Sequence, residues 1–108
     1  MMKAVYWQRG ESLDYINSGN SVIEANTIID LGTRIAVAGT SINPGEKGSV
    51  HVTGVYRIDK KDGDEISFGT AVYFAESGIT ATKSGTPAGY AAEQSAAGTE
   101  TILVKLLG

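Results

Sequence analysis

Residues 78–84 contain the residue types of a phosphate-binding loop, but not in the spacing that such a loop needs. A P-loop has the form G-x-x-x-x-G-K-[ST], because its second glycine lets the backbone amides wrap around the phosphates. Here Thr82, rather than a glycine, precedes Lys83. Gly85 and Pro87 also interrupt the helix that should follow the loop. We therefore do not expect this stretch to bind a nucleotide.

The polar turn at residues 59–64 is rich in carboxylates, which could in principle hold a cation or act as an acid–base pair. A calcium loop of the EF-hand type needs oxygen ligands at alternating positions. Counted from Asp59, the third and fifth positions are Lys61 and Gly63, so the pattern fails. The dipeptide Asp62-Gly63 favours a hairpin turn instead. We expect a solvated loop here and no metal site.

The other possible nucleophiles and bases are isolated from one another. His51 is the single histidine, and no second candidate ligand stands near it in the sequence. The chain has no cysteine, which excludes a disulfide framework, a thiolate metal site and a cysteine nucleophile. Serine, threonine and lysine are abundant, but a nucleophile needs a base and an orienting partner. The sequence thus predicts no catalytic residue, no cofactor and no metal, in a protein that is not an enzyme.

Aromatic side chains are the more informative candidates. Tyr6 and Trp7 are adjacent, so they would point to opposite faces of a strand, and one of them would lie outside the local core. Such a side chain either covers the edge of the core or anchors a protein–protein contact. With Tyr15, this pair forms our hypothetical interface. Nucleic-acid stacking would need interleaved basic residues, and only Lys3 and Arg9 flank the pair in a chain of net charge −3.

Strands are the elements that must position these residues. Short runs of Val, Ile, Tyr and Phe alternate with polar breaks that contain glycine, which is typical of an all-β domain. The length of 108 residues fits one domain, residues 1–108, and every apolar run is too short for a membrane-spanning helix. The expected strands cover residues 3–8, 12–17, 21–24, 27–30, 34–38, 49–58, 71–75, 79–83 and 101–107.

Two of the expected strands have distinctive patterns. Residues 34–38 have no polar face after Arg34, which predicts burial on both sides. Residues 49–58 form the longest expected strand, and Gly54 within it indicates a bulge or the close approach of another backbone. No repeat of fixed period is evident along the chain.

Residues 88–97 are ambiguous between a helix and a strand. The segment is rich in alanine and ends at Gly98, which fits a helix and its C-terminal stop. Its apolar face would contain only Tyr90 as a large residue, however, and a helix of this length is marginal without packing. We favour a strand over residues 88–94, followed by a turn through Ala97 and Gly98.

The order and spacing of several short motifs resemble those of the small phage capsid decoration, or capsid cement, proteins. Each motif alone is weak, but together they extend over nearly the whole chain. One departure is Ala88, where the family often has Ile. The matching positions are Met2, Lys3, Tyr6, Gln8, Gly10, Glu11 and Leu13; the segment 45–58; Ile66, Gly69, Val72, Tyr73 and Phe74; Gly89 to Ala91; Ala96 to Gly98; and Val104 to Leu106.

The resemblance implies a compact small β-barrel or β-tulip of short antiparallel strands, and a structural role without enzymatic activity. Such proteins, encoded by phages or prophages, bind the outside of the head where shell subunits meet and stabilise it. The implied partners are the major capsid protein and further copies of the chain, often as a homotrimer. The implied location is the capsid surface of the virion, reached from the host cytoplasm during assembly.

Two other interpretations remain at this stage. One is a generic β-barrel binding module, either OB-like or carbohydrate-binding. The other follows a label that family members also carry, that of a RecA/RadA-type recombinase. The sequence argues against this label, since it has no Walker A loop and is too short and too rich in strands for a nucleotide-binding α/β core.

Overall fold

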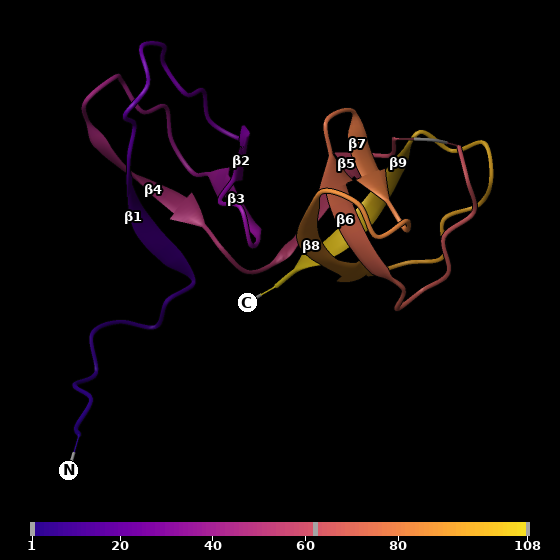
Figure 1. The fold of residues 1–108 in the computed structure, drawn as a ribbon, viewed down its shortest axis with the longest axis horizontal. Coiled ribbons are helices and arrows are strands. Elements are labelled where there is room, and N and C mark those ends of the chain that lie inside the picture. Colours follow the sequence, from indigo (N-terminus) through magenta and orange to yellow (C-terminus); the bar gives the residue numbers. More distant parts are fainter. Residues whose placement is uncertain (1, 62, 108) are drawn as a thin grey trace.

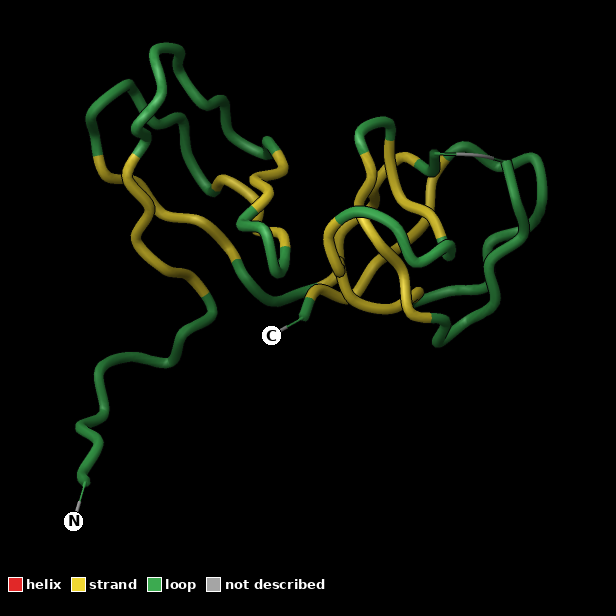
Figure 2. Tube along the Cα trace, in the orientation of Figure 1, coloured by secondary structure: helices red, strands yellow, loops and turns green. Residues whose placement is uncertain are grey.

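The computed structural model describes residues 2–61 and 63–107, and within them it contains strands, turns and loops but no helix (Figure 2). The all-β prediction is therefore confirmed. Asp62, part of the predicted hairpin dipeptide, lies outside the described residues. The strands are β1 (Ser12–Ile16), β2 (Ile28–Asp30), β3 (Ile35–Ala38), β4 (Lys47–His51), β5 (Val55–Asp59), β6 (Ala71–Ala75), β7 (Gly78–Thr80), β8 (Thr86–Ala91) and β9 (Thr101–Leu106).

The strands form two antiparallel sheets, which define two lobes of the molecule (Figure 1). The N-lobe, residues 12–51, has the strand order β1-β4-β3-β2. The C-lobe, residues 55–106, has the order β5-β9-β8-β6-β7. Neither sheet closes into a barrel. The C-lobe sheet curls far enough that Lys60, just after β5, makes a single parallel bridge to Ile79 of β7, but β5 and β7 form no continuous ladder.

The prediction of one long strand over residues 49–58 is wrong. β4 ends at His51, β5 begins at Val55, and the two strands belong to different sheets. Between them the chain crosses from one lobe to the other, and Gly54 accepts a hydrogen bond from the backbone of Leu106. Every second residue is apolar on both sides of this crossing, because Val50 and Val52 face the core of the N-lobe and Ile58 faces the core of the C-lobe. The expected strand at residues 3–8 is also absent, since that segment has no partner strand.

The ambiguous segment at residues 88–97 contains no helix. It is a strand in its first part, β8, which begins at Thr86 and ends at Ala91. Gly89 in β8 has a φ of +143°, and a Cβ at this position would collide with the carbonyl oxygen of Lys105 in the neighbouring strand. Glycine is therefore needed here for close packing of β8 against β9, and the preference for a strand over a helix is confirmed.

The two lobes repeat one topology. If β1, β2, β3 and β4 are matched with β5, β6, β8 and β9, the strand order of the N-lobe becomes that of the C-lobe, with β7 added at its edge. In both lobes the first strand pairs with the last one. Both lobes also contain an isolated antiparallel bridge, Ile23 with Ile42 in the N-lobe and Ile66 with Ser95 in the C-lobe.

The same turn follows each of the four bridging residues. Its fourth residue donates a backbone hydrogen bond to the carbonyl of its first, and its third residue has a positive φ, as in a type II turn. Pro44 and Gly45 occupy the second and third positions that this turn type prefers. No fixed period appears in the sequence because β7 and its loop are inserted in the C-lobe alone. The four turns are Glu24 to Thr27, Asn43 to Glu46, Ser67 to Thr70 and Ala96 to Thr99.

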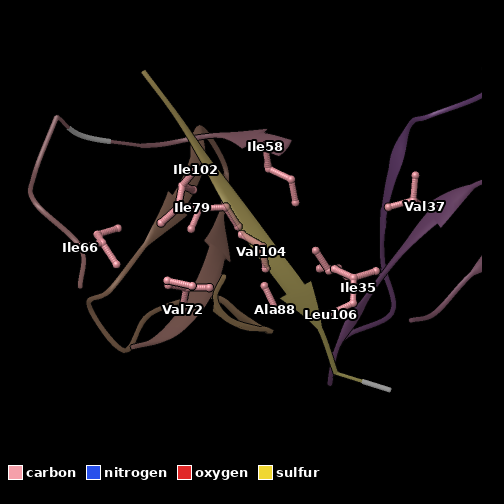
Figure 3. Packing of buried hydrophobic residues seen from close by; sticks show 11 residues of the cluster. Ile35, Val37, Ile58, Ile66, Val72, Ile79, Ala88, Ile102, Val104 and Leu106 are labelled. Carbon is pink, nitrogen blue, oxygen red and sulfur yellow. The ribbon is translucent and has the colours of Figure 1, made fainter. Parts of the chain in front are cut away.

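β3 is buried on both faces, as its sequence predicts, and this strand connects the two hydrophobic cores. Ala36 and Ala38 pack into the core of the N-lobe. Ile35 and Val37, on the opposite face, join the core of the C-lobe (Figure 3). The C-lobe core is completed by Ile58, Ile66, Val72, Ile79, Ala88, Ala91, Ile102, Val104 and Leu106.

A polar contact fixes the two lobes beside this apolar junction. The hydroxyl of Thr86 in β8 donates to both carboxylate oxygens of Asp30 at the end of β2, at 2.7 and 2.8 Å. The backbone N–H of Gly32 donates to the same carboxylate. These bonds to the charged form lower the pKa of Asp30 below its ordinary value, with the Thr86 hydroxyl the larger cause.

This contact predicts a dependence of stability on acid. The pKa of Asp30 is lower in the folded protein than in the unfolded chain. Its contribution to the free energy of unfolding is therefore complete above the unfolded-state pKa of about 3.9, and it is lost as the pH falls through the folded-state pKa. The difference in unfolding free energy between the native protein and Asp30→Asn should therefore be present at pH 6 and shrink below about pH 4. Urea denaturation at several pH values measures it. Asp14→Asn, at an exposed position of β1, is the control, and an equal dependence in both variants would contradict the prediction.

Candidate functional site

The N-terminal arm, residues 2–11, carries two of the three predicted interface residues. Tyr6 is 79% exposed and Trp7 is 88% exposed, and Val5 beside them is equally uncovered. The arm extends away from both lobes (Figure 1). Its side-chain contacts among the described residues are a hydrogen bond from Gln8 to the Ser12 carbonyl and a long, exposed Arg9–Glu11 pair. Val5, Tyr6 and Trp7 thus remain largely uncovered by their own chain.

Tyr15, the third predicted interface residue, is not part of this group. It lies in β1 opposite Gly48 of β4 and packs, half-buried, against the N-lobe core beside Ile23. The structure therefore brings Tyr6 and Trp7 together on the arm and places Tyr15 in the wall of the lobe.

His51 has a structural position at the start of the crossing between the lobes. Its Nδ1 shares a hydrogen bond of 2.9 Å with the Ser12 hydroxyl, and its ring stacks on Tyr56 with centroids 6.5 Å apart. Among residues 2–61 and 63–107, no three side chains of the metal-binding types gather into a site.

The stretch at residues 78–84 forms β7 and a tight turn, not a phosphate cradle. Gly78 lies directly against the backbone of Asp59 and Lys60. A Cβ at this position would lie 2.7 Å from the Asp59 carbonyl oxygen, too close for any other residue. Its role is to let β7 approach the end of β5, so this glycine serves packing rather than ligand binding.

Lys60 forms the polar cluster that most resembles a catalytic arrangement, and nothing in the sequence singled it out. Its side chain is buried, and its ammonium donates to the carbonyl of Asp64 at 2.7 Å, the hydroxyl of Ser95 at 3.0 Å and the carbonyl of Ala96 at 3.2 Å. A serine hydroxyl beside a lysine can act as a nucleophile with its base. Two of the three acceptors are backbone atoms, however, which leave no signature in a sequence.

The geometry around Lys60 is that of an anchor. An ammonium has three donors, and here each one meets an acceptor, so no lone pair is directed at Ser95. Ser95 is 3% exposed and its hydroxyl also bonds the Thr101 carbonyl. The lysine therefore ties the segment after β5 to the turn before β9, and a substrate would have no access to the hydroxyl.

A groove of about 530 Å³ lies where the two lobes meet. Its apolar wall contains side chains of both lobes, and its rim carries the carboxylates of Asp59 and Glu76. Partial burial raises the pKa of the Tyr56 phenol in this wall. The apolar lining consists of Ile28, Val37, Tyr56, Ile58 and Phe74.

These features define a class of protein, a two-lobed all-β fold with an exposed N-terminal arm and a groove between its lobes. The described residues contain no helix long and apolar enough to cross a membrane. The family model of the phage cement protein matches residues 7–106. The chain thus belongs to the phage cement protein family, which implies a structural role associated with a phage capsid and a place on the capsid surface of the virion. Nothing supports the recombinase label. The comparisons with curated proteins and with solved structures give no match.

The anchor role of Lys60 can be measured by substitution. Lys60→Met removes the ammonium, so the buried Ser95 hydroxyl and the part-buried carbonyls of Asp64 and Ala96 lose its hydrogen bonds, which should lower the unfolding free energy by about 1–3 kcal/mol. The neighbouring Lys61→Met, at an exposed position, should change it by less than about 0.5 kcal/mol. Urea denaturation of both variants gives the comparison, and equal effects would show that the cluster around Lys60 does not stabilise the fold.

Proposed function

We propose that this protein decorates the outer surface of an assembled phage or prophage head and stabilises the shell. Its partners are the major capsid protein and neighbouring copies of itself, in a homotrimeric cluster. It acts without catalysis, and it is present in the host cytoplasm until it joins the particle. Membership of the phage cement family supports this proposal most directly.

The exposed arm is the observation on this chain that fits the role. A side chain such as Trp7, 88% exposed in the single chain, gains favourable free energy when a partner covers it. Aromatic side chains of this kind commonly anchor protein–protein contacts. We assign Tyr6 and Trp7 to the contact with a neighbouring molecule, and Tyr15 to its margin, since that side chain is already half-buried in its own lobe.

Repetition makes weak contacts sufficient for such a role. A shell presents many equivalent sites, and a clustered protein engages several of them at once, so that modest affinity at each contact gives tight overall binding. A two-lobed body whose lobes share a packed strand, with an uncovered arm, suits this requirement because the arm is accessible to a neighbouring molecule.

Replacing Trp7 with alanine distinguishes a side chain that contacts a partner from one that stabilises the core. Because Trp7 covers none of the core, Trp7→Ala should leave the melting temperature within about 2 °C of the native value. The same change should reduce occupancy on expanded heads by about tenfold or more, since an interface anchor is lost. Co-sedimentation with heads and thermal melting give the two values.

Phe68→Ala is the matched control, because Phe68 is an aromatic side chain, 69% exposed, outside the arm. It should change neither quantity. A loss of stability in Trp7→Ala as large as its loss of binding would identify Trp7 as a core residue instead.

A further inference from the structure

We propose that the interlobe groove of one copy is the binding site for the N-terminal arm of a second copy. This inference deepens the proposed function, since it names the partner that covers Tyr6 and Trp7. It is argued from the chemistry of the two surfaces, which belong to the same chain and which the single molecule leaves unpaired.

The arm has an apolar centre with a cation on each side. Val5, Tyr6 and Trp7 are 88, 79 and 88% exposed. Lys3 precedes them and Arg9 follows them. In an extended chain, which rises about 3.3 Å per residue, Arg9 lies roughly 7 Å beyond Trp7 and Lys3 roughly 13 Å before it. The arm is therefore an aromatic anchor flanked by positive charges.

The groove has the complementary arrangement. Its wall offers apolar side chains from both lobes, including Ile28 of β2 and Phe74 of β6. Its volume of about 530 Å³ is sufficient for an indole side chain with part of the adjoining backbone. Its other lining residues are polar or glycine, so the groove combines an apolar wall with polar groups, as concave binding sites commonly do.

The charges at the rim match those of the arm. Asp59 and Glu76 line the groove at exposed positions, and neither carboxylate makes an ion pair within the described part of the chain. Arg57, the rim's one arginine, already faces Glu93 at 3.7 Å and the Thr101 hydroxyl. The groove thus offers two carboxylates without an ion pair to an arm that carries Lys3 and Arg9, of which Arg9 would exchange its exposed 3.9 Å pair with Glu11 for the new contact. Rim charges of this kind orient a partner.

An arm that enters the groove of the next copy makes a head-to-tail contact. The two surfaces differ, so the contact is heterologous, and it closes into a ring when the rotation between copies permits. Each copy then gives one arm and receives one. This arrangement covers every Trp7 and fills every groove, as a small cyclic cluster requires.

The absence of cysteine in the native chain makes the contact directly testable by cross-linking. Gln8→Cys places a thiol on the arm beside the aromatic pair, and Ser77→Cys places one at the exposed rim of the groove. Mixing the two variants with a short bis-maleimide should give a covalent dimer of one copy of each. Ser84→Cys, an exposed serine of the same lobe outside the groove lining, is the matched control and should give little product.

Trp7 supplies a second measurement, because it is the single tryptophan of the chain. Its emission should shift to shorter wavelength as the protein concentration rises and the arm becomes buried. Glu76→Lys should move the midpoint of this shift to a concentration about fivefold higher, which corresponds to one exposed charge pair. Both measurements use the full chain without any shell.

Three results would overturn the inference: equal yields with Ser84→Cys and Ser77→Cys, an emission that does not change with concentration, or a cross-link that forms within single molecules of a doubly substituted chain. Binding to heads is measured separately. Failed cross-linking with retained head binding rejects this inference alone, whereas efficient cross-linking without head binding rejects the proposed function alone.

Discussion

The double burial of β3 is the constraint on which the rest of this structure depends. A strand of four residues, Ile35–Ala38, supplies small side chains to one core and large ones to the other. Because successive side chains alternate between the faces of a strand, a shift of one residue in its register would exchange the two sets. Alanine would then face the C-lobe and isoleucine would be forced into the close-packed N-lobe. The register of β3 thus fixes both cores, and with them the position of the groove between the lobes.

The repeated topology explains how so small a chain forms two packed lobes. Each lobe is completed by pairing its first strand with its last, and by a bridge followed by a type II turn at two places. The two lobes differ in one strand and in the segment attached to them. The C-lobe has the additional strand β7, whose Gly78 lies against the end of β5. The N-lobe sheet has one strand fewer, and the N-terminal arm leads into it. The groove lies between the two lobes, so it exists only because they are joined.

Local pattern was sufficient to predict part of this fold. The double burial of residues 35–38, the bounds of β6 and the strand at β8 all follow from side-chain type and alternation. The split at residues 52–54 could not be predicted, because which sheet a strand joins depends on distant partners. The cluster around Lys60 could not be predicted for a similar reason, since two of its acceptors, on Ser95 and Ala96, lie 35 and 36 residues further along the chain. For the site, Tyr6 and Trp7 are exposed and Tyr15 packs with its own lobe, and the hypothesis of a contact stays a prediction.

The register of β1 with β4 has a mechanical consequence. Ser12, where the arm begins, is paired with His51, where the chain leaves for the C-lobe. Tension between a held arm and the rest of the molecule is therefore applied at a single end of this ladder. Such a load opens hydrogen-bonded pairs one after another, instead of straining all of them together as a shearing load would. The hydrogen bond between the Ser12 hydroxyl and His51 lies at the end of the ladder where separation of the strands would start, so it resists that separation.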